Sequence, residues 1–285
     1  MAVQTDVATG AITVNQTAYA ETILKRFGMT ACTSVTTPMD TGHALSVSPT
    51  GSTLLRDDEA SVYRSMIGAL MFLAVCTRPD IAFTVSNLAC YMAAPTDVHT
   101  VAAKRLLRYI RGTTALGLTY GGPSAKGGVN TLVGYADASY NSDPDNSRSV
   151  GAYVFMLNGA AVSWRSKRQA TVALSTTEAE YMALCSAVQE AVYLRSILSS
   201  LGAPQASTVI FEDNQPTIHV ATNAVTTPRT KHIAVKYHYV REQVLAHTVK
   251  LEYIGTDEMV ADALSKALPR PTLSKFQRVM LGTLT

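Results

Sequence analysis

Four acidic residues that lie far apart along the chain have the greatest potential for chemistry. They are Asp137, Glu180, Asp213 and Asp262. Carboxylate oxygens are the ligands that Mg²⁺ and Mn²⁺ prefer, and four of them gathered without a matched set of basic residues would repel one another strongly. A pair of such ions about 3.5–4 Å apart stabilises both the attacking and the leaving oxygen in phosphodiester hydrolysis. If the four acids converge, they predict metal-dependent phosphodiester cleavage.

Each acid also has an ordinary structural interpretation when it is taken alone. Asp137 could cap a turn at a strand end, and Glu180 could interact favourably with the dipole of its helix. Asp213 could cap the helix that follows it, and Asp262 could be a solvated surface charge. The chemical interpretation therefore requires elements that bring the four carboxylates together.

The elements that carry these acids predict a mixed sheet. Asn158-Gly159 is a strong hairpin signal between two apolar strands, and Ser175 or Thr176 can cap the long helix that carries Glu180. The expected elements, in order, are strands at 132–140, 150–157 and 160–165, a helix at 176–201, a strand at 209–211, helices at 216–222 and 229–246, a strand at 248–254 and a helix at 259–268. This order favours an α/β fold, in which two strands join an antiparallel meander through helices.

The first part of the chain predicts a smaller, mainly helical region. Its expected elements are a hairpin over 3–14, a helix over 19–27, and helices at 58–75, 80–92 and 97–110. The segment Gly121–Asn130 is the clearest linker in the chain. We therefore expect one region at 1–126, a second domain at 127–270 and a C-terminal tail at 271–285.

A cluster of basic residues lies on the last helix of the first part. Lys104, Arg108 and Arg111 share one helix face through their i, i+4 and i+7 spacing. Such a face can be ordinary solvated surface, or it can follow the phosphates of a nucleic acid without reading its bases. The sequence leaves both interpretations open.

Composition limits the classes of protein that need to be considered. The chain has 285 residues, 47% hydrophobic content and a net charge of +3, so any basic surface must be local. The four cysteines form no CxxC pair. No signal peptide is visible, and the longest apolar run, Ile67–Cys76, is too short to span a bilayer. We expect a soluble intracellular protein.

Six segments of the second part match the order and spacing of one known family. They are Tyr135–Ser139, Ser163–Gln169, Leu174–Tyr181, Glu212–Gln215, Arg229–Ile233 and Val260–Lys266. These segments resemble the ribonuclease H domain of copia-type LTR retrotransposon polyproteins. Upstream, Ile23–Met29 with Pro38-Met39, Tyr63–Leu70 and Thr77–Ile81 resemble the end of the reverse transcriptase of the same polyprotein, its thumb and connection.

The resemblance implies a fold and a reaction. The fold is a ribonuclease H-like mixed five-stranded sheet flanked by helices, preceded by a small, mainly helical thumb and connection region. The reaction is hydrolysis of the RNA strand of an RNA–DNA hybrid during reverse transcription. Asp137, Glu180, Asp213 and Asp262 would be the catalytic acids and would hold two Mg²⁺ ions, which Mn²⁺ can replace. The family pattern places the ligand before the aromatic residue, and this selects Glu180 over Glu178.

The resemblance also implies contacts and partners. The candidate nucleic-acid contacts are Lys104, Arg108, Arg111, Ser139, Lys167, Arg168, Thr176 and Asn214. The expected partners are the RNA–DNA hybrid and the polymerase fingers, palm and integrase of the same polyprotein, with no membrane. The expected location is a cytoplasmic virus-like particle or the nucleus.

Two departures from the family pattern affect these expectations. The polymerase aspartate pair is missing, so this chain should not synthesise DNA. Cellular ribonucleases H often carry a mobile histidine before the last helix, whereas Gly255–Glu258 contains none. The alternative hypothesis is a catalytically inert or domesticated remnant that binds nucleic acid or a protein.

Overall fold

The computed structural model describes residues 1–42, 45–121, 130–223 and 234–283. The interior of the predicted linker and the segment Arg229–Ile233 lie outside these described residues.

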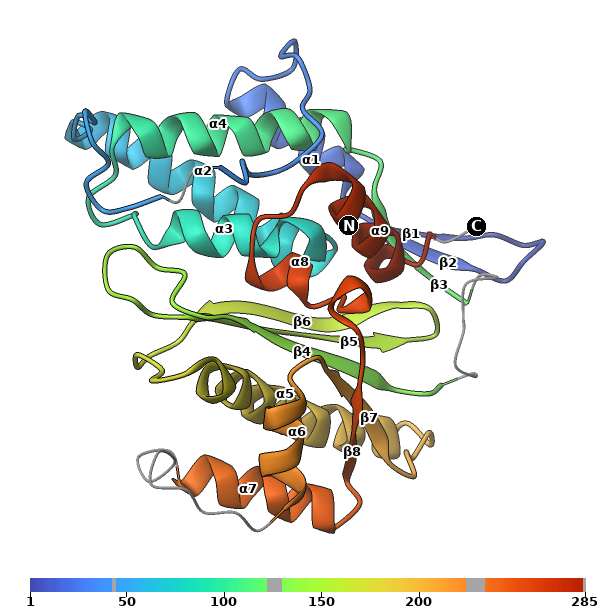
Figure 1. Ribbon diagram of the computed structural model, residues 1–285. Coiled ribbons are helices and arrows are strands. Elements are labelled where there is room, and N and C mark those ends of the chain that lie inside the picture. The colour runs from blue at the N-terminus through green and yellow to red at the C-terminus, as the bar shows by residue number, and fades with distance from the viewer. Residues whose placement is uncertain (43–44, 122–129, 224–233, 284–285) are drawn as a thin grey trace.

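A five-stranded mixed sheet forms the centre of the second part (Figure 1). Its order is β6-β5-β4-β7-β8. The pairs β4–β5 and β5–β6 are antiparallel, whereas β7 is parallel to both β4 and β8. The bounds are β4 Val133–Ser139, β5 Val150–Leu157, β6 Ala160–Arg168, β7 Thr208–Glu212 and β8 Val249–Tyr253. This arrangement confirms the predicted ribonuclease H-like sheet, in which a meander gains two strands through helical connections.

Helices cover both faces of this sheet (Figure 1). On one face α5 (Thr176–Ser200) packs against β4 and β5, with α6 (Gln215–Thr222) and α7 (Ala234–Leu245) beyond it. On the other face lie α8 (Asp262–Ser265), α9 (Arg270–Leu281) and α3 (Ala82–Ala89). The final predicted helix is shorter than expected, because the backbone becomes extended at Lys266.

The first part combines a small sheet with a helical stack. The expected hairpin is β1 (Ala2–Thr5) with β2 (Ile12–Asn15), and a third strand that the sequence did not predict, β3 (Gly117–Tyr120), pairs with β2. The helical elements of the stack are α1 Thr17–Arg26, α2 Asp57–Cys76, η1 Pro79–Ile81, α3 and α4 Asp97–Gly112. Side chains such as Ile67, Leu70 and Leu107, which are fully buried, form its core. The predicted mainly helical region is therefore confirmed, with one additional strand.

One described helix, α2, is long and apolar enough to cross a membrane when only length and composition are considered. Only 39% of an 18-residue window of this helix is buried inside the protein. Tyr63, Ile67 and Leu70 on this helix belong to the core of the first part. Because core helices of folded proteins pass the same test, this helix is weak evidence for a membrane span.

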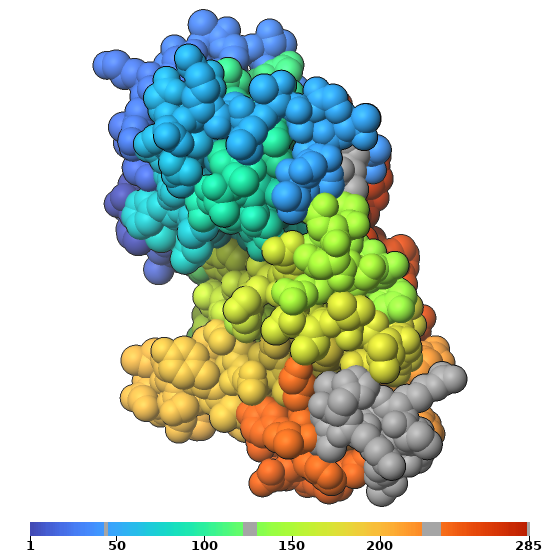
Figure 2. Space-filling view, turned by 90° about the vertical axis from the view of Figure 1, so that its left-hand side faces the viewer, coloured from blue at the N-terminus to red at the C-terminus, as the bar shows by residue number. Residues whose placement is uncertain are grey.

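The two parts are in direct contact, as the space-filling view shows (Figure 2). The indole Nε1 of Trp164 on β6 donates to the Ala74 carbonyl oxygen of α2 at 2.8 Å. The Tyr120 hydroxyl of β3 donates to the Ala161 carbonyl oxygen of β6 at 2.7 Å. A shared apolar cluster includes Leu118 of β3 together with Phe276 and Met280 of α9.

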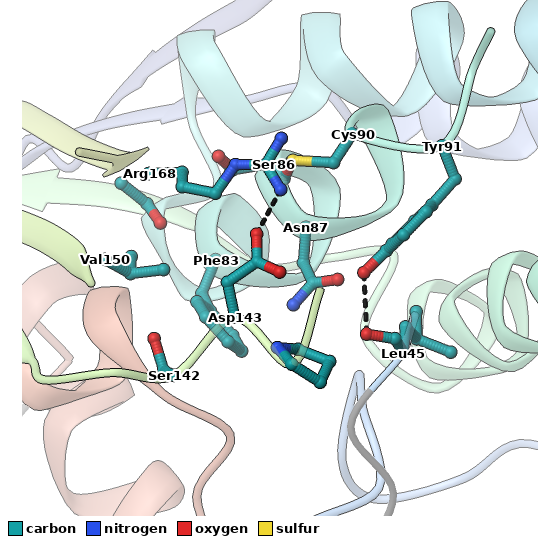
Figure 3. Close-up of a pocket in the computed structure, with 12 residues that line it drawn as sticks. Leu45, Phe83, Ser86, Asn87, Cys90, Tyr91, Ser142, Asp143, Val150 and Arg168 are labelled. Atoms are coloured by element: carbon teal, nitrogen blue, oxygen red, sulfur yellow. Dashed lines mark hydrogen bonds and ion pairs between the residues drawn. The ribbon is translucent and has the colours of Figure 1, made fainter. Parts of the chain in front are cut away.

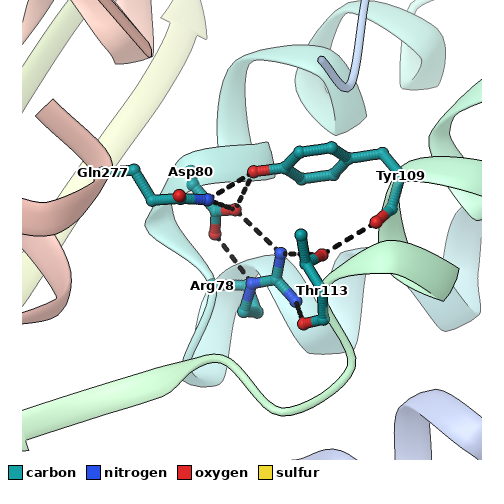
Figure 4. A network of polar contacts seen from close by, with 5 residues as sticks. All are labelled: Arg78, Asp80, Tyr109, Thr113 and Gln277. Carbon is teal, nitrogen blue, oxygen red and sulfur yellow. Dashed lines mark hydrogen bonds and ion pairs between the residues drawn. The ribbon is translucent and has the colours of Figure 1, made fainter. Parts of the chain in front are cut away.

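A buried polar network fixes α9 to the helical stack (Figure 4). Arg78 donates to both carboxylate oxygens of Asp80 at 2.8 Å, and the Tyr109 hydroxyl also donates to Asp80, at 2.7 Å. Gln277 of α9 donates to the same carboxylate at 3.0 Å. The predicted tail at 271–285 thus begins within an ordered helix that contacts both parts of the molecule.

Candidate active site

The structure brings three of the four predicted acids together at one edge of the sheet. Asp137, Glu180 and Asp213 each offer a carboxylate oxygen, and these oxygens lie within 4.8 Å of one another. Asp137 is on β4, and Asp213 follows β7, so the parallel pairing of these strands places both acids at the same sheet edge. Ser175 caps α5 by accepting a hydrogen bond from the Glu178 amide at 3.2 Å, and Glu180 lies in the next turn.

Burial and mutual repulsion raise the pKa values of this group. Burial, followed by the charges of Asp137, Glu212 and Asp213, raises the pKa of Glu180 to about 11. Burial is also the largest cause that raises the pKa of Asp137, although the Lys266 ammonium opposes it. These shifts have the sign expected where several carboxylates are held close together away from water.

The donor set fits a divalent cation. Oε2 of Glu180 and Oε2 of Glu212 are buried, and neither has a hydrogen-bond donor among the described residues. Unpaired buried carboxylate oxygens are costly unless a cation or a proton satisfies them. Hard oxygen donors in this number are the ligands that Mg²⁺ and Mn²⁺ prefer.

The fourth predicted acid, Asp262 on α8, lies beside Asp137 and outside the group of three. Its carboxyl group is within hydrogen-bonding reach of Asp137, and Ser265 also donates to Asp137 through a short hydrogen bond. The Lys266 Nζ lies 2.6 Å from Oδ1 of Asp262. Burial and then Asp137 raise the pKa of Asp262 to about 7, against the opposing effect of Lys266.

Four residues of this site were not selected from the sequence. Glu212 is fully buried beside the acids, and burial raises its pKa well above the usual range. Thr256 donates to Oδ2 of Asp213 at 2.7 Å, while Ser265 and Lys266 contact Asp137 and Asp262. The i, i+4 spacing of Asp262 and Lys266 was a readable signal for their ion pair. The other contacts depend on tertiary structure.

Three candidate nucleic-acid contacts lie close in sequence or structure to the acids. Ser139 ends β4 two residues after Asp137, and Thr176 is an exposed residue that begins α5. Asn214 follows Asp213, but its Oδ1 caps α6 by accepting from the Thr217 amide at 3.0 Å. The Asn214 side chain therefore has a structural role in addition to any contact with a ligand.

Lys167 and Arg168 lie at the end of β6, beside a basic cleft. This cleft has a volume of about 180 Å³, and Arg165 and Lys236 also line it, with no acid among the described lining residues. Arg168 is itself ion-paired with Asp143 at the wall of a smaller cavity of about 50 Å³ between the two parts (Figure 3). Lys167 is exposed, whereas the charge of Arg168 is already partly compensated.

The basic face of α4 also holds a neighbouring loop. Nε of Arg108 donates to the Thr33 carbonyl oxygen, and Nε of Arg111 donates to the Thr30 carbonyl oxygen, both at 2.8 Å. Lys104 is exposed. The two arginines therefore stabilise the segment 30–37 against α4 and still place their positive charge at the surface of the helical stack.

Comparison with known proteins identifies several relatives. The chain is 40% identical over 266 residues to the Retrovirus-related Pol polyprotein from transposon TNT 1-94 of Nicotiana tabacum, and this match covers 93% of the chain and 19% of that protein. It is 35% identical to the Pol polyprotein from transposon RE2 of Arabidopsis thaliana, over 93% of the chain and 18% of that protein. The chain thus spans about a fifth of the length of these curated relatives.

A shorter relative and a solved structure add to these matches. The chain is 49% identical over 132 residues to Secreted RxLR effector protein 161 of Plasmopara viticola, which covers 46% of the chain and 90% of that protein. The crystal structure of LC11-RNase H1 in complex with RNA/DNA hybrid aligns with 47% of the chain and 94% of its own, with a TM-score of 0.37 and 14% identity. No protein-family model matches the chain.

Proposed function

The chain belongs to the copia-type retrotransposon Pol polyproteins, and we propose that its ribonuclease H-like domain hydrolyses the RNA strand of RNA–DNA hybrids. The observation that supports this proposal most directly is the convergence of Asp137, Glu180 and Asp213 within 4.8 Å, with Asp262 beside Asp137. Separate elements hold these acids together at the cost of repulsion, which an ordinary structural role does not explain.

In this proposal the acids hold two Mg²⁺ ions, or Mn²⁺ in their place. Glu180 and Glu212 supply unpaired oxygens, while Asp137 and Asp213 supply oxygens at the ends of neighbouring strands. When bound, the ions supply positive charge to the attacking and leaving oxygens of a phosphodiester. Thr256 and Ser265 orient the carboxylates of Asp213 and Asp137 through their hydrogen bonds.

The hybrid is held mainly through its backbone. Lys167 and the basic cleft at the end of β6 are suited to phosphates, as is the face formed by Lys104, Arg108 and Arg111. We assign Ser139 and Thr176, which lie two and four residues from Asp137 and Glu180, to contacts with ribose hydroxyls, by which a protein distinguishes RNA from DNA.

Cleavage of a labelled RNA–DNA hybrid in Mg²⁺ tests the proposal. Asp213→Asn should lose more than the roughly 10–100-fold that removal of an outer-shell partner costs, because it removes a direct ligand. Asp257→Asn is the matched control, since Asp257 is an exposed acid that is not one of the converging acids, and it should cleave like the wild type. Products should carry a 5′-phosphate and a 3′-hydroxyl.

The match to a secreted effector gives a reason to test a second candidate, a catalytically inert remnant that binds nucleic acid or protein. That candidate predicts that the wild type and Asp213→Asn bind the hybrid equally and that neither cleaves it. The same assay, followed by a filter-binding measurement on both proteins, separates the two candidates.

A further inference from the structure

The neighbour of Asp262 sets a limit on how the acids can share two cations. Lys266 Nζ lies 2.6 Å from Oδ1 of Asp262, and Asp262 is almost fully buried. The three acids whose oxygens converge within 4.8 Å are Asp137, Glu180 and Asp213, and Asp262 is outside this set. The ammonium group of Lys266 thus lies where a cation bound between Asp137 and Asp262 would contact the Asp262 carboxylate.

Lys266 is held in this position by its surroundings. The residue follows α8 with an extended backbone, so its side chain turns back over that helix to reach Asp262. It also lines a narrow gap between α8 and the helical stack, together with Met39 and Phe83. The side chain is 39% exposed. Part of the side chain thus already faces solvent, which is where the ammonium would lie if it left Asp262.

The Lys266 ammonium and a second divalent ion are both positively charged, so they repel each other when both lie beside Asp262. Two like charges a few ångströms apart in a partly buried site repel more strongly than they do in water, because the effective dielectric constant is lower there. The three converging acids remain available to a first ion while Lys266 stays in place, and Oε2 of Glu180 is buried without a hydrogen-bond partner among the described residues.

We propose that Lys266 is a built-in competitor for the second divalent ion, so that the site holds one ion tightly and admits another only when the ammonium leaves Asp262. This inference rests on the proposed function and extends it. It concerns the order and affinity of ion binding, and makes Lys266 a positioning residue for Asp262.

Binding of Mn²⁺ to the full-length, EDTA-treated chain tests the proposal directly. Isothermal titration should give the wild type one tight site and a second site at least tenfold weaker. Lys266→Met should tighten the second site at least tenfold, and Lys266→Arg, which keeps the charge, should resemble the wild type. Lys250→Met is the matched control, because Lys250 is an exposed residue of β8 that likewise pairs with an acid, Glu252.

Unchanged or weaker second-site binding in Lys266→Met overturns the inference, because the lysine would then be neutral or helpful to the ion. If the wild type nevertheless binds Mn²⁺ and cleaves the hybrid, the proposed function stands and only the inference about Lys266 fails. If neither protein binds Mn²⁺ at all, the proposed metal-dependent function is overturned and the inference falls with it.

A second measurement needs no variant and covers the case in which Lys266→Met does not fold. Acylation of Lys266 in the wild type, followed by mass spectrometry, should increase at the Mn²⁺ concentration that fills the second site. Lys250 gives the internal reference. Constant labelling of Lys266 while two ions bind overturns the proposal.

Discussion

Glu180 is the residue at which the conflict between site chemistry and stability should be most visible. Burial first, and then neighbouring acids, raise its pKa in the folded chain to about 11, far above about 4.3 for an unfolded glutamate. A raised acid pKa contributes stability below the unfolded value, and that contribution is lost as the pH rises. The metal-free protein should therefore lose stability as the pH rises from about 4.3 towards about 11.

Glu180→Gln should make the metal-free protein more stable at pH 8. With a pKa of about 11, Glu180 must stay protonated in the folded chain at a cost in free energy, whereas glutamine needs no proton. We expect the melting temperature in EDTA to rise by several degrees and the stabilisation by Mn²⁺ to shrink. Glu190→Gln on the same helix is the control. Glu190 lies outside the group of acids and accepts a hydrogen bond of 2.6 Å from Ser163. A lower melting temperature for Glu180→Gln in EDTA would contradict the repulsion argument.

His99 gives the helical stack a separate pH dependence. Its Nδ1 accepts the Thr96 amide at 2.9 Å, so Nε2 carries the proton and donates to the Ser46 carbonyl oxygen, also at 2.9 Å. Burial lowers the pKa of His99 in the folded chain. The stability that this histidine contributes is then complete above about pH 6.5, the unfolded value, and is lost as the pH falls below it.

Urea unfolding at pH 7.5 and pH 5.5 checks this histidine. His99→Gln should be less stable than the wild type at pH 7.5 and should show a smaller loss of stability on acidification. His238→Gln, at an exposed position on α7, is the matched control and should keep the wild-type difference. Equal acid sensitivity in wild type and His99→Gln would assign the pH dependence to other groups.

At the scale of elements, the network around Asp80 joins η1, α4 and α9 (Figure 4). Arg78→Met should cost about 3–5 kcal/mol, because it leaves the Asp80 carboxylate buried without its bidentate partner. The double variant Arg78→Met/Asp80→Leu should recover much of that loss, since it removes both charges. Urea unfolding of wild type, both single variants and the double variant forms the cycle.

Additive costs in this cycle would contradict the assigned coupling. The pH dependence gives a second check. Burial acts to raise the pKa of Asp80, but Arg78 outweighs it and the net pKa is lowered. The contribution of Asp80 is therefore present above about pH 3.9 and is lost as the pH falls through its folded value. Arg78→Met should remove this stabilisation at neutral pH.

The elements that the sequence predicted well are those with long apolar patterns or strong turn signals. The strand that carries Asp137, the Asn158-Gly159 turn and the capped helix α5 are examples, and both turn residues have positive φ. β3 was missed because four residues give too little periodicity to distinguish a strand from a loop. Residues 271–285 were treated as a tail, although Pro271 at the helix start and Gly282 at its end are helix signals.

For the site, the sequence was enough to select the four acids, but not to predict the residues that surround them. Family resemblance and position on the expected elements selected Asp137, Glu180, Asp213 and Asp262. The burial of Glu212 and the effect of Lys266 on Asp137 depend on distances across separate elements, which no local pattern encodes. Similarly, the sequence could not show whether Arg108 and Arg111 are free for a ligand or hydrogen-bonded to residues 30–33, as they are in the structure.

At the scale of the whole molecule, α9 connects the two parts through its apolar face and its C-terminus. Phe276 is almost fully buried in the cluster shared with β3 and β6. Gly282 ends the helix with φ +70°, and a Cβ there would lie 2.1 Å from the Thr119 carbonyl oxygen. A fragment cut at residue 270 would lose these contacts and should be less stable than one that ends at 285.

The intact chain should unfold in one cooperative transition, because the two parts share this apolar cluster and the Asp80 network. Trp164 is the only tryptophan, and its Nε1 donates to Ala74 across the boundary, so its fluorescence reports on separation of the two parts. Far-UV circular dichroism reports on the helices of both, and the two thermal curves should coincide.

Phe276→Ala should cost about 3–5 kcal/mol and shift both thermal curves together. Phe72→Ala is the control: Phe72 is half exposed on α2, so its loss should shift neither curve appreciably. A fluorescence change that precedes the loss of helix signal would mean that the parts separate before they unfold.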